Sequence, residues 1–320
     1  MARYTRNSAV LAKIETTYAT DAAPTGSANA VLISNLSVNP LNSNNIDRDL
    51  IRPFFGSSEQ LIGTVYKEIS FDVELAGSGT AGTAPAWGVL LRACAFAETL
   101  NAVVSADYTP ITDSQESLTI YYYRSGVLHK LLGARGDCTL KAGIGTRPVF
   151  SFKFMGLDGN MTAAANPSLT LSAWKTPLSV SDANTGDLTF GCTYAAGALS
   201  GGTSYPSRGL ELPFANDVVH TPLLGGESID VTNRQIGGTL ELDLTAAQEV
   251  AFMTSVKANS TQSLGLVHGT VAGNKVLLYM PAVQFITPAE SDLNGRALSK
   301  YNLRVVPGAS GNDELRIVAI

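Results

Sequence analysis

The chain has 320 residues, and its 22 basic and 27 acidic side chains make up only 15% of it, whereas an ordinary soluble domain has about 25% charged residues. Its hydrophobic share of 45% excludes an intrinsically disordered chain, which combines low hydrophobicity with high charge. Its net charge of −5 excludes the basic surface that grips a nucleic-acid backbone.

Short alternating segments predict strands, and turns rich in the chain's 30 Gly and 14 Pro residues separate them. Apolar and polar residues alternate along a strand that has one buried face, which is typical of antiparallel sheets. In chain order, the predicted strands lie at residues 71–75, 118–123, 150–154, 240–244, 276–279 and 301–305. The fold class is therefore predicted as all-β with a minor helical part.

Two helices are predicted between these strands. The first is expected over residues 85–98, because Pro85 is tolerated in a first turn and the apolar residues after it repeat at helical spacing. The second is expected over residues 245–256, where Thr245 and Gln248 fit a capping box.

The sequence contains one internal duplication. The segment Pro-Phe-Phe-Gly at 53–56 aligns with Pro-Leu-Leu-Gly at 222–225, and strand 71–75 aligns with strand 240–244 at the same offset. A helix and further strands follow in both copies, which predicts two tandem domains. The predicted divisions are an N-terminal arm at 1–30, a first domain at 31–157, a connector at 158–187, a second domain at 188–307 and a C-terminal segment at 308–320.

Each copy has a long segment before its acidic strand, at residues 39–64 and 216–238. Loops beyond about 12–15 residues without structure of their own are usually functional or disordered. Because both segments are rich in apolar residues, we expect them to pack on a neighbour rather than extend into solvent. The candidate contact residues are Arg52, Phe54, Phe55, Leu61, Ile62, Leu223, Leu224 and Ile229.

No catalytic, cofactor or metal site is predicted. Residues 77–82 fit the dinucleotide-binding pattern G-x-G-x-x-G, but no second parallel strand follows to carry the acidic partner, so a connecting loop is favoured. The histidines His129, His220 and His268 have no further metal ligand at a spacing that repeats. No membrane span is predicted, since the longest uncharged apolar run, residues 276–289, is shorter than about 20 residues.

Six segments spread over nearly the whole chain carry a family resemblance: AKIETTYATDAAP (12–24), NIDRDLIRP (45–53), VELAGSGTAGTAP (73–85), LLRACAFAET (90–99), NRQ (233–235) and GNDE (311–314). In their order along the chain and in their residues, these segments resemble the major tail tube proteins of bacteriophages with long, non-contractile tails. The resemblance implies tube domains that are β-sandwiches or β-barrels with one flanking helix and one long loop. Six such domains close a ring around a channel, so two tandem domains imply a trimeric ring with pseudo-sixfold symmetry.

The resemblance also implies the partners and the location of the chain. Copies of the chain stack into a tube through the long loops, and the tube meets the tape measure, tail terminator and distal tail proteins. The protein is expected in the virion tail after synthesis in the host cytoplasm, without a cofactor.

DNA passes through the channel without specific binding, which favours an acidic channel wall. The candidates for that wall are Asp72, Glu74, Glu241 and Asp243. Alternation does not decide which face of the strand is which, so an outward face or a seam between subunits stays open for these carboxylates.

Other functions stay open beside the tube subunit. A receptor-binding or glycan-binding β-sandwich module of the tail is the main alternative, and the tyrosine run 121–123 is its only aromatic candidate. The tube of a contractile machine shares the fold, but its subunits usually have one domain. A hydrolase is the least favoured, because no nucleophile motif of the G-x-S-x-G type is present.

Overall fold

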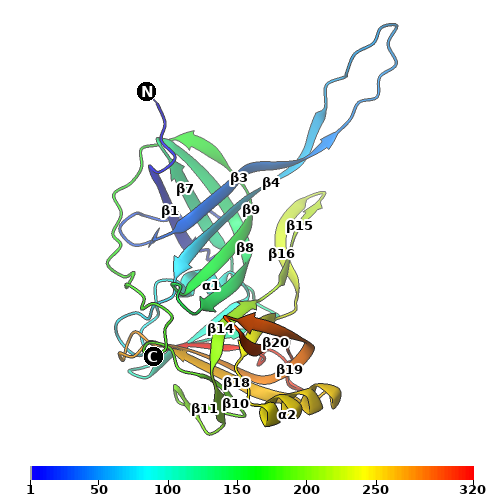
Figure 1. Cartoon of the computed structure of the whole chain (residues 1–320). Helices are drawn as coiled ribbons and strands as arrows, with labels where there is room; N and C mark the ends of the chain where they lie inside the picture. The colour runs from blue at the N-terminus through cyan, green and yellow to red at the C-terminus, as the bar shows by residue number, and fades with distance from the viewer. Residues whose placement is uncertain (1) are drawn as a thin grey trace.

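The computed structural model describes residues 2–320, and most of its strands belong to one large, twisted antiparallel sheet (Figure 1). The strands of the N-terminal part are β1 (Ser8–Ile14), β2 (Ala30–Val31), β3 (Ser34–Ile46), β4 (Leu61–Glu74), β5 (Phe96–Asn101), β6 (Ser105–Pro110), β7 (Leu118–Arg124), β8 (Val127–Gly143) and β9 (Val149–Ala163). The predominance of strands confirms the prediction of a mainly antiparallel β protein.

The C-terminal part begins after residues 164–187, which contain no helix or strand; the first residues of the predicted connector, 158–163, are the end of β9. Its strands are β10 (Leu188–Phe190), β11 (Thr193–Ala195), β12 (Ala198–Ser200), β13 (Thr203–Tyr205), β14 (Ser207–Pro213), β15 (Asn216–Leu223), β16 (Gly226–Arg234), β17 (Gly237–Leu242), β18 (Thr261–His268), β19 (Val276–Leu293), β20 (Arg296–Val305) and β21 (Arg316–Ala319).

The two parts arrange their strands in similar orders. In the N-terminal part the strands pair in the order β2-β1-β7-β8-β9-β4-β3. In the C-terminal part the order is β13-β10-β18-β19-β20-β17-β14. The strand before the helix is β4 in the first part, where it lies between β3 and β9. In the second part it is β17, which lies between β14 and β20.

Two strand pairings join the parts. The C-terminal end of β8 pairs with β14, with Leu140 opposite Leu212. The last strand, β21, lies between β19 and β6, so the end of the chain ties the C-terminal part to the N-terminal part. The result is a sheet that runs without interruption from β3 to β19, and Figure 1 shows β8 and β14 at the junction.

Alternation along the strands produces the core. On β4, Ile69, Phe71 and Val73 are buried, while the residues between them face the other side of the sheet. The ring of Phe71 lies 6.2 Å from that of Phe152 and 5.9 Å from that of Phe154 on β9. Aromatic contacts at these distances stabilise beyond the area they bury.

The second predicted helix is confirmed, and the first is too long. Helix α2 (Ala246–Lys257) begins after Thr245, whose side chain and that of Gln248 form the predicted capping box. Helix α1 (Gly88–Arg92) ends well before residue 98, because Ala95 adopts a positive φ of 61° and the chain continues as β5. Pairing of β5 with β6 satisfies the backbone there in place of a helix.

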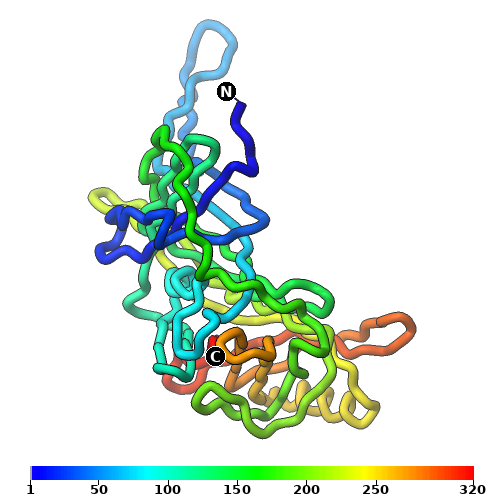
Figure 2. The backbone as a smooth tube through the Cα atoms, turned by 90° about the vertical axis from the view of Figure 1, so that its left-hand side faces the viewer, coloured from blue at the N-terminus to red at the C-terminus, as the bar shows by residue number. Residues whose placement is uncertain are grey.

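The two long segments are not loops throughout, which corrects the prediction. Residues 216–238 contain the hairpin β15–β16, which forms a separate two-stranded sheet. Of residues 39–64, the two ends extend β3 and β4, and only residues 47–60 lie between strands. Figures 1 and 2 show that the end of β3, residues 47–60 and the start of β4 form a long arm that projects from the body of the molecule.

Candidate assembly surfaces

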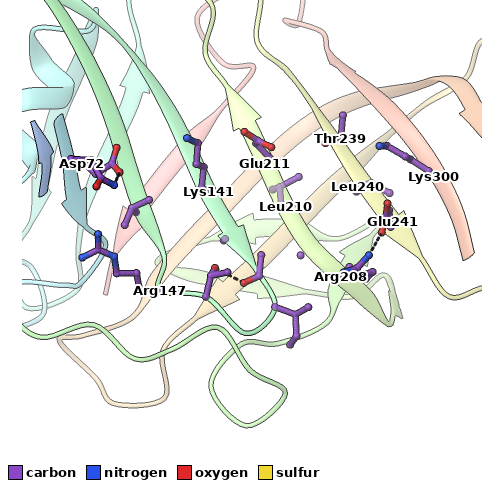
Figure 3. A pocket seen from close by; sticks show the side chains of 17 residues that line it. Asp72, Lys141, Arg147, Arg208, Leu210, Glu211, Thr239, Leu240, Glu241 and Lys300 are labelled. Carbon is purple, nitrogen blue, oxygen red and sulfur yellow. Dashed lines mark hydrogen bonds and ion pairs between the residues drawn. The ribbon is translucent and has the colours of Figure 1, made fainter. Parts of the chain in front are cut away.

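The face of the sheet turned away from the core is polar where the two parts join. Figure 3 shows Asp72, Lys141, Glu211, Glu241 and Lys300 on this face, each from a different strand. The two strands of the junction bring Lys141 and Glu211 directly opposite each other. The side chains line a shallow depression of about 520 Å³. We call this surface the polar face.

Three of the four predicted channel carboxylates lie on the polar face. Asp72 and Glu74 are on β4, and Glu241 is on β17, which pairs directly with β14. Asp243 lies just past the end of β17 and pairs with Arg296.

Each of these carboxylates has a partner in the chain. Glu74 Oε1 is 3.0 Å from Arg147 Nη1, and Glu241 Oε2 is 3.1 Å from Arg208 Nη1. The side-chain amide of Asn35 donates to Asp72 Oδ2 at 2.6 Å. The partners of Glu74 and Glu241 could not be identified from the sequence, because Arg147 lies in a turn and Arg208 lies in a strand, both distant from these carboxylates along the chain. The polar face is therefore mixed in charge rather than purely acidic.

The arm carries apolar side chains that point into solvent. Phe55 and Ile51 at its tip are fully exposed, at 107% and 103%. The remaining exposed apolar residues of the arm are Leu41, Ile46, Leu50, Phe54, Leu61 and Ile62. Single exposed apolar residues are ordinary, but eight of them on one projecting segment indicate an interaction surface.

Polar contacts within the arm give it a defined shape. Glu59 pairs with Arg48 and lies 3.5 Å from Arg52 Nη2. The amide of Gln60 donates to Asp47 Oδ1 at 2.5 Å across the base of the loop. Of the predicted contact residues on the arm, Arg52 is therefore paired within the arm itself, while the aromatic and aliphatic ones are exposed.

The hairpin β15–β16 packs on the chain's own N-terminal part. Arg135 Nη1 donates to the carbonyl of Ile229 at 2.7 Å and to Asp230 Oδ1 at 3.1 Å. The backbone N–H of Ile229 donates to the hydroxyl of Tyr18 at 2.6 Å, and the guanidinium of Arg135 lies 4.9 Å from the Tyr18 ring centroid. Residues from three distant stretches of sequence thus hold this hairpin in place.

Two of the predicted contact residues on this hairpin are exposed and one is not. Leu224 and Gly225 form its turn, Leu223 ends β15 just before it and is exposed, and Leu224 is fully exposed at 107%. Ile229 is 0% exposed, so its surface is already used inside the chain. The sequence could not show which of these three residues is exposed, because the partners that bury Ile229 are remote in sequence.

The base of the hairpin is anchored by buried polar groups. The side-chain amide of Asn216 donates to the carbonyls of Cys94 at 2.9 Å and Gly136 at 3.1 Å. The backbone N–H of Asn216 donates to Asp137 Oδ1 at 2.9 Å. Burial nevertheless raises the pKa of Asp137 above its ordinary value, although this contact opposes the shift.

The features that could have carried chemistry have structural explanations. The N–H groups of Gly77 and Gly79 donate to Asn274 Oδ1 and to the carbonyl of Gly273, both at 2.8 Å, so they do not converge on a ligand. Between residues 2 and 320, no cluster of three or more His, Cys, Asp or Glu side chains could hold a metal ion. No helix in that same range is long and apolar enough to cross a membrane.

The tyrosine run proposed for glycan binding is not a surface cluster. Tyr121, Tyr122 and Tyr123 are all buried in β7. The hydroxyl of Tyr121 donates to Asp21 within the chain. This observation removes the aromatic candidate of the receptor-binding alternative.

A comparison with protein families places nearly the whole chain in one family. Residues 5–303 match the family described as phage tail tube protein. None of the curated proteins is significantly similar to the chain. The match covers nearly all of the sequence, including the arm, the hairpin β15–β16 and the junction of the two parts.

Proposed function

Because the chain belongs to the phage tail tube protein family, whose members are structural, non-enzymatic components of the virion tail, we propose that three copies close into a ring and that rings stack into the tube of a long, non-contractile tail. The continuous sheet from β3 to β19 is the observation that carries this proposal. The two halves of this sheet act as two tube domains in tandem, which gives the trimer pseudo-sixfold symmetry.

The matching strand orders of the two parts support the tandem arrangement. β4, β9, β8 and β3 of the N-terminal part correspond to β17, β20, β19 and β14. A helix follows β4 and another follows β17. Within β3 and β14 the ladder shifts register at a bulge near its N-terminal end. Such bulges are features that a duplicated domain would keep.

The junction of β8 with β14 then serves as the template of a ring interface. Three of the six domain interfaces in a trimer lie within chains, and the other three join one chain to the next. This arrangement accounts for a sequence with only 15% charged residues, because much of its surface meets further copies of itself.

We assign the polar face to the channel. Its carboxylates lie among Arg147, Arg208, Lys141 and Lys300, and two of them, Glu74 and Glu241, are paired with arginines at about 3 Å. Paired charges give a surface of low net potential, so a phosphate backbone is neither held nor strongly repelled. Smooth passage of DNA thus follows from local neutralisation rather than from a uniformly acidic wall.

The arm is the contact between rings. It projects from one end of the molecule and exposes Phe54, Phe55 and Ile51 to solvent. Burial of such side chains against a second ring contributes about 1.5–3 kcal/mol each. The tape measure, tail terminator and distal tail proteins are the expected partners at the ends and in the channel.

Electron microscopy of the purified protein, with native mass measurement of single rings, tests the proposal. Stacked rings with a central hole and a mass of three chains are expected. Rings of six chains would refute the tandem arrangement. Discrete particles that bind glycans and never stack would refute the tube.

A further inference from the structure

The junction of β8 and β14 has a defined register and bonding pattern. The N–H of Phe214 donates to the carbonyl of Cys138, and the N–H of Ile144 donates to the carbonyl of Arg208. In an antiparallel ladder, hydrogen-bonded pairs alternate with non-bonded pairs. Leu212 opposite Leu140 is therefore a bonded pair, and Glu211 opposite Lys141 is a non-bonded pair with closely spaced side chains.

Two edges of the same sheet have no partner strand in the described chain. β3 pairs with β4 on one side only. Beyond Gln284, β19 pairs with β20 on one side only. Figure 2 shows the tip of the β19–β20 hairpin, coloured orange, projecting from the body. Exposed strand edges are templates for pairing with another chain.

These two edges correspond to the two strands of the internal junction. β3 holds the place of β14, and each has a residue of positive φ at its bulge, Asn35 at 52° and Gly209 at 102°. β19 corresponds to β8. β8 lies beside β9, which pairs with β4, and β19 lies beside β20, which pairs with β17. The free edges are thus the two halves of a junction that the chain has already formed once.

We propose that the ring closes when the free edge of β3 in one copy pairs antiparallel with the free edge of β19 in a second copy, in the register of the β8–β14 junction. The inference rests on the proposed function and specifies its interface. Transfer of the internal register places these residues opposite one another: Leu36 and Asp292, Ser37 and Ser291, Val38 and Glu290, and Asn39 and Ala289.

The prolines of the two edges fit this register. Pro40 follows Asn39 and Pro288 precedes Ala289, so the two prolines come next along the ladder, where β3 and β19 each shift register against their own neighbour strand. In the internal junction this position is a hydrogen-bonded pair, and neither proline has an N–H to donate. The ladder therefore ends there without an unpaired donor, and the arm beyond Pro40 is free to leave the ring.

The composition of β3 also fits a second copy as the occupant. The strand has no charged residue among its 13 positions. Edge strands of monomeric proteins usually carry charges, especially lysine, that prevent pairing. β3 lacks this protection over its whole length, as expected of an edge that is meant to be covered.

Engineered cysteines test the register. Ser37 and Ser291 correspond to the closely spaced pair Glu211 and Lys141, so the double variant S37C/S291C is expected to form disulfides between copies in assembled tubes. Non-reducing electrophoresis should show dimers and trimers and no larger covalent species. The native cysteines, Cys94, Cys138 and Cys192, are buried and do not compete.

Two variants with the second cysteine shifted by two residues are the matched controls, S37C/A289C and S37C/L293C. Weaker cross-linking in both supports the register, and stronger cross-linking in either overturns it. If tubes form but none of the three variants cross-links, the strand pairing is wrong while the proposed function stands. If the unmodified protein forms no rings at all, the proposed function fails as well.

Discussion

The arm and the hairpin β15–β16 occupy corresponding places in the two parts of the molecule, yet they meet different surroundings. Each connects the two strands that precede a helix, and each has a fully exposed apolar residue at its tip, Phe55 and Leu224. The hairpin folds back on β8 and β9, whereas the arm extends away from the body (Figures 1 and 2). The difference teaches that similar apolar segments find partners inside the chain in one case and only outside it in the other.

The reason lies in what each segment faces. The hairpin meets Arg135 and Tyr18, which hold the backbone of Ile229 through hydrogen bonds. The arm forms polar contacts only within itself, around Glu59. In a closed ring the neighbouring domain that the arm lacks would belong to another copy.

Removal of the arm is expected to have the largest effect of the changes that test this difference. Replacement of residues 48–59 by a short Asn-Gly turn is expected to abolish stacking, because the exposed apolar contacts of the arm are lost, while single rings persist. Electron microscopy and sedimentation velocity measure tubes against rings, and circular dichroism checks the fold.

The single variant L224N is the matched control for the arm. It completes a favoured Asn-Gly pair at 224–225, the two turn residues of β15–β16, and should leave stacking largely intact. Tubes of normal length in the arm-deleted protein would contradict the assignment of the arm to ring stacking.

Alanine at one isoleucine in each segment compares their contributions to subunit stability. Ile229→Ala removes a fully buried side chain and should lower the free energy of unfolding by about 2–4 kcal/mol. Ile51→Ala alters a fully exposed side chain and should change it by less than about 0.5 kcal/mol. Urea denaturation of dilute, unassembled subunits gives both values. Equal losses would show that the two segments are not packed as described.

A smaller effect is expected from the arginine that holds the hairpin. Arg135→Lys loses the fork that reaches Ile229 and Asp230 and should cost about 1–3 kcal/mol. Arg52→Lys on the arm changes an exposed pair and should cost less than about 1 kcal/mol. Thermal unfolding of the two variants provides the measurement, and an Arg52 variant as unstable as the Arg135 variant would contradict the comparison.

The smallest effect is expected at the base of the hairpin. Burial raises the pKa of Asp137 in the folded chain, so its favourable contribution exists below the unfolded pKa of about 3.9 and is lost as the pH rises through the folded pKa. Asp137→Asn keeps an acceptor for the Asn216 N–H and carries no charge. The variant should therefore gain stability relative to the unmodified chain as the pH rises from about 4 to 7. Parallel stability curves over this range, measured by urea denaturation, would exclude the effect.

Several parts of the fold were predictable because their causes are local. Alternation over neighbouring residues defines strands such as β4, and a hydroxyl three residues from a glutamine defines the start of α2. The first helix was predicted too long because its apolar spacing continues past Arg92, where the positive φ of Ala95 turns the chain into β5. A backbone turn of this kind depends on the strand that pairs next, not on periodicity.

The sequence by itself determined a sparsely charged, mainly antiparallel β protein with an acidic strand in each half and two apolar segments before these strands. Only the tertiary structure decided that Ile229 is buried, that Glu74 and Glu241 meet arginines, and that β8 pairs with β14. These outcomes depend on residues far apart in the chain, since strand edges and ion-pair partners are selected by which surfaces folding brings together. Alternation fixes the two faces of a strand, but the fold chooses its neighbours.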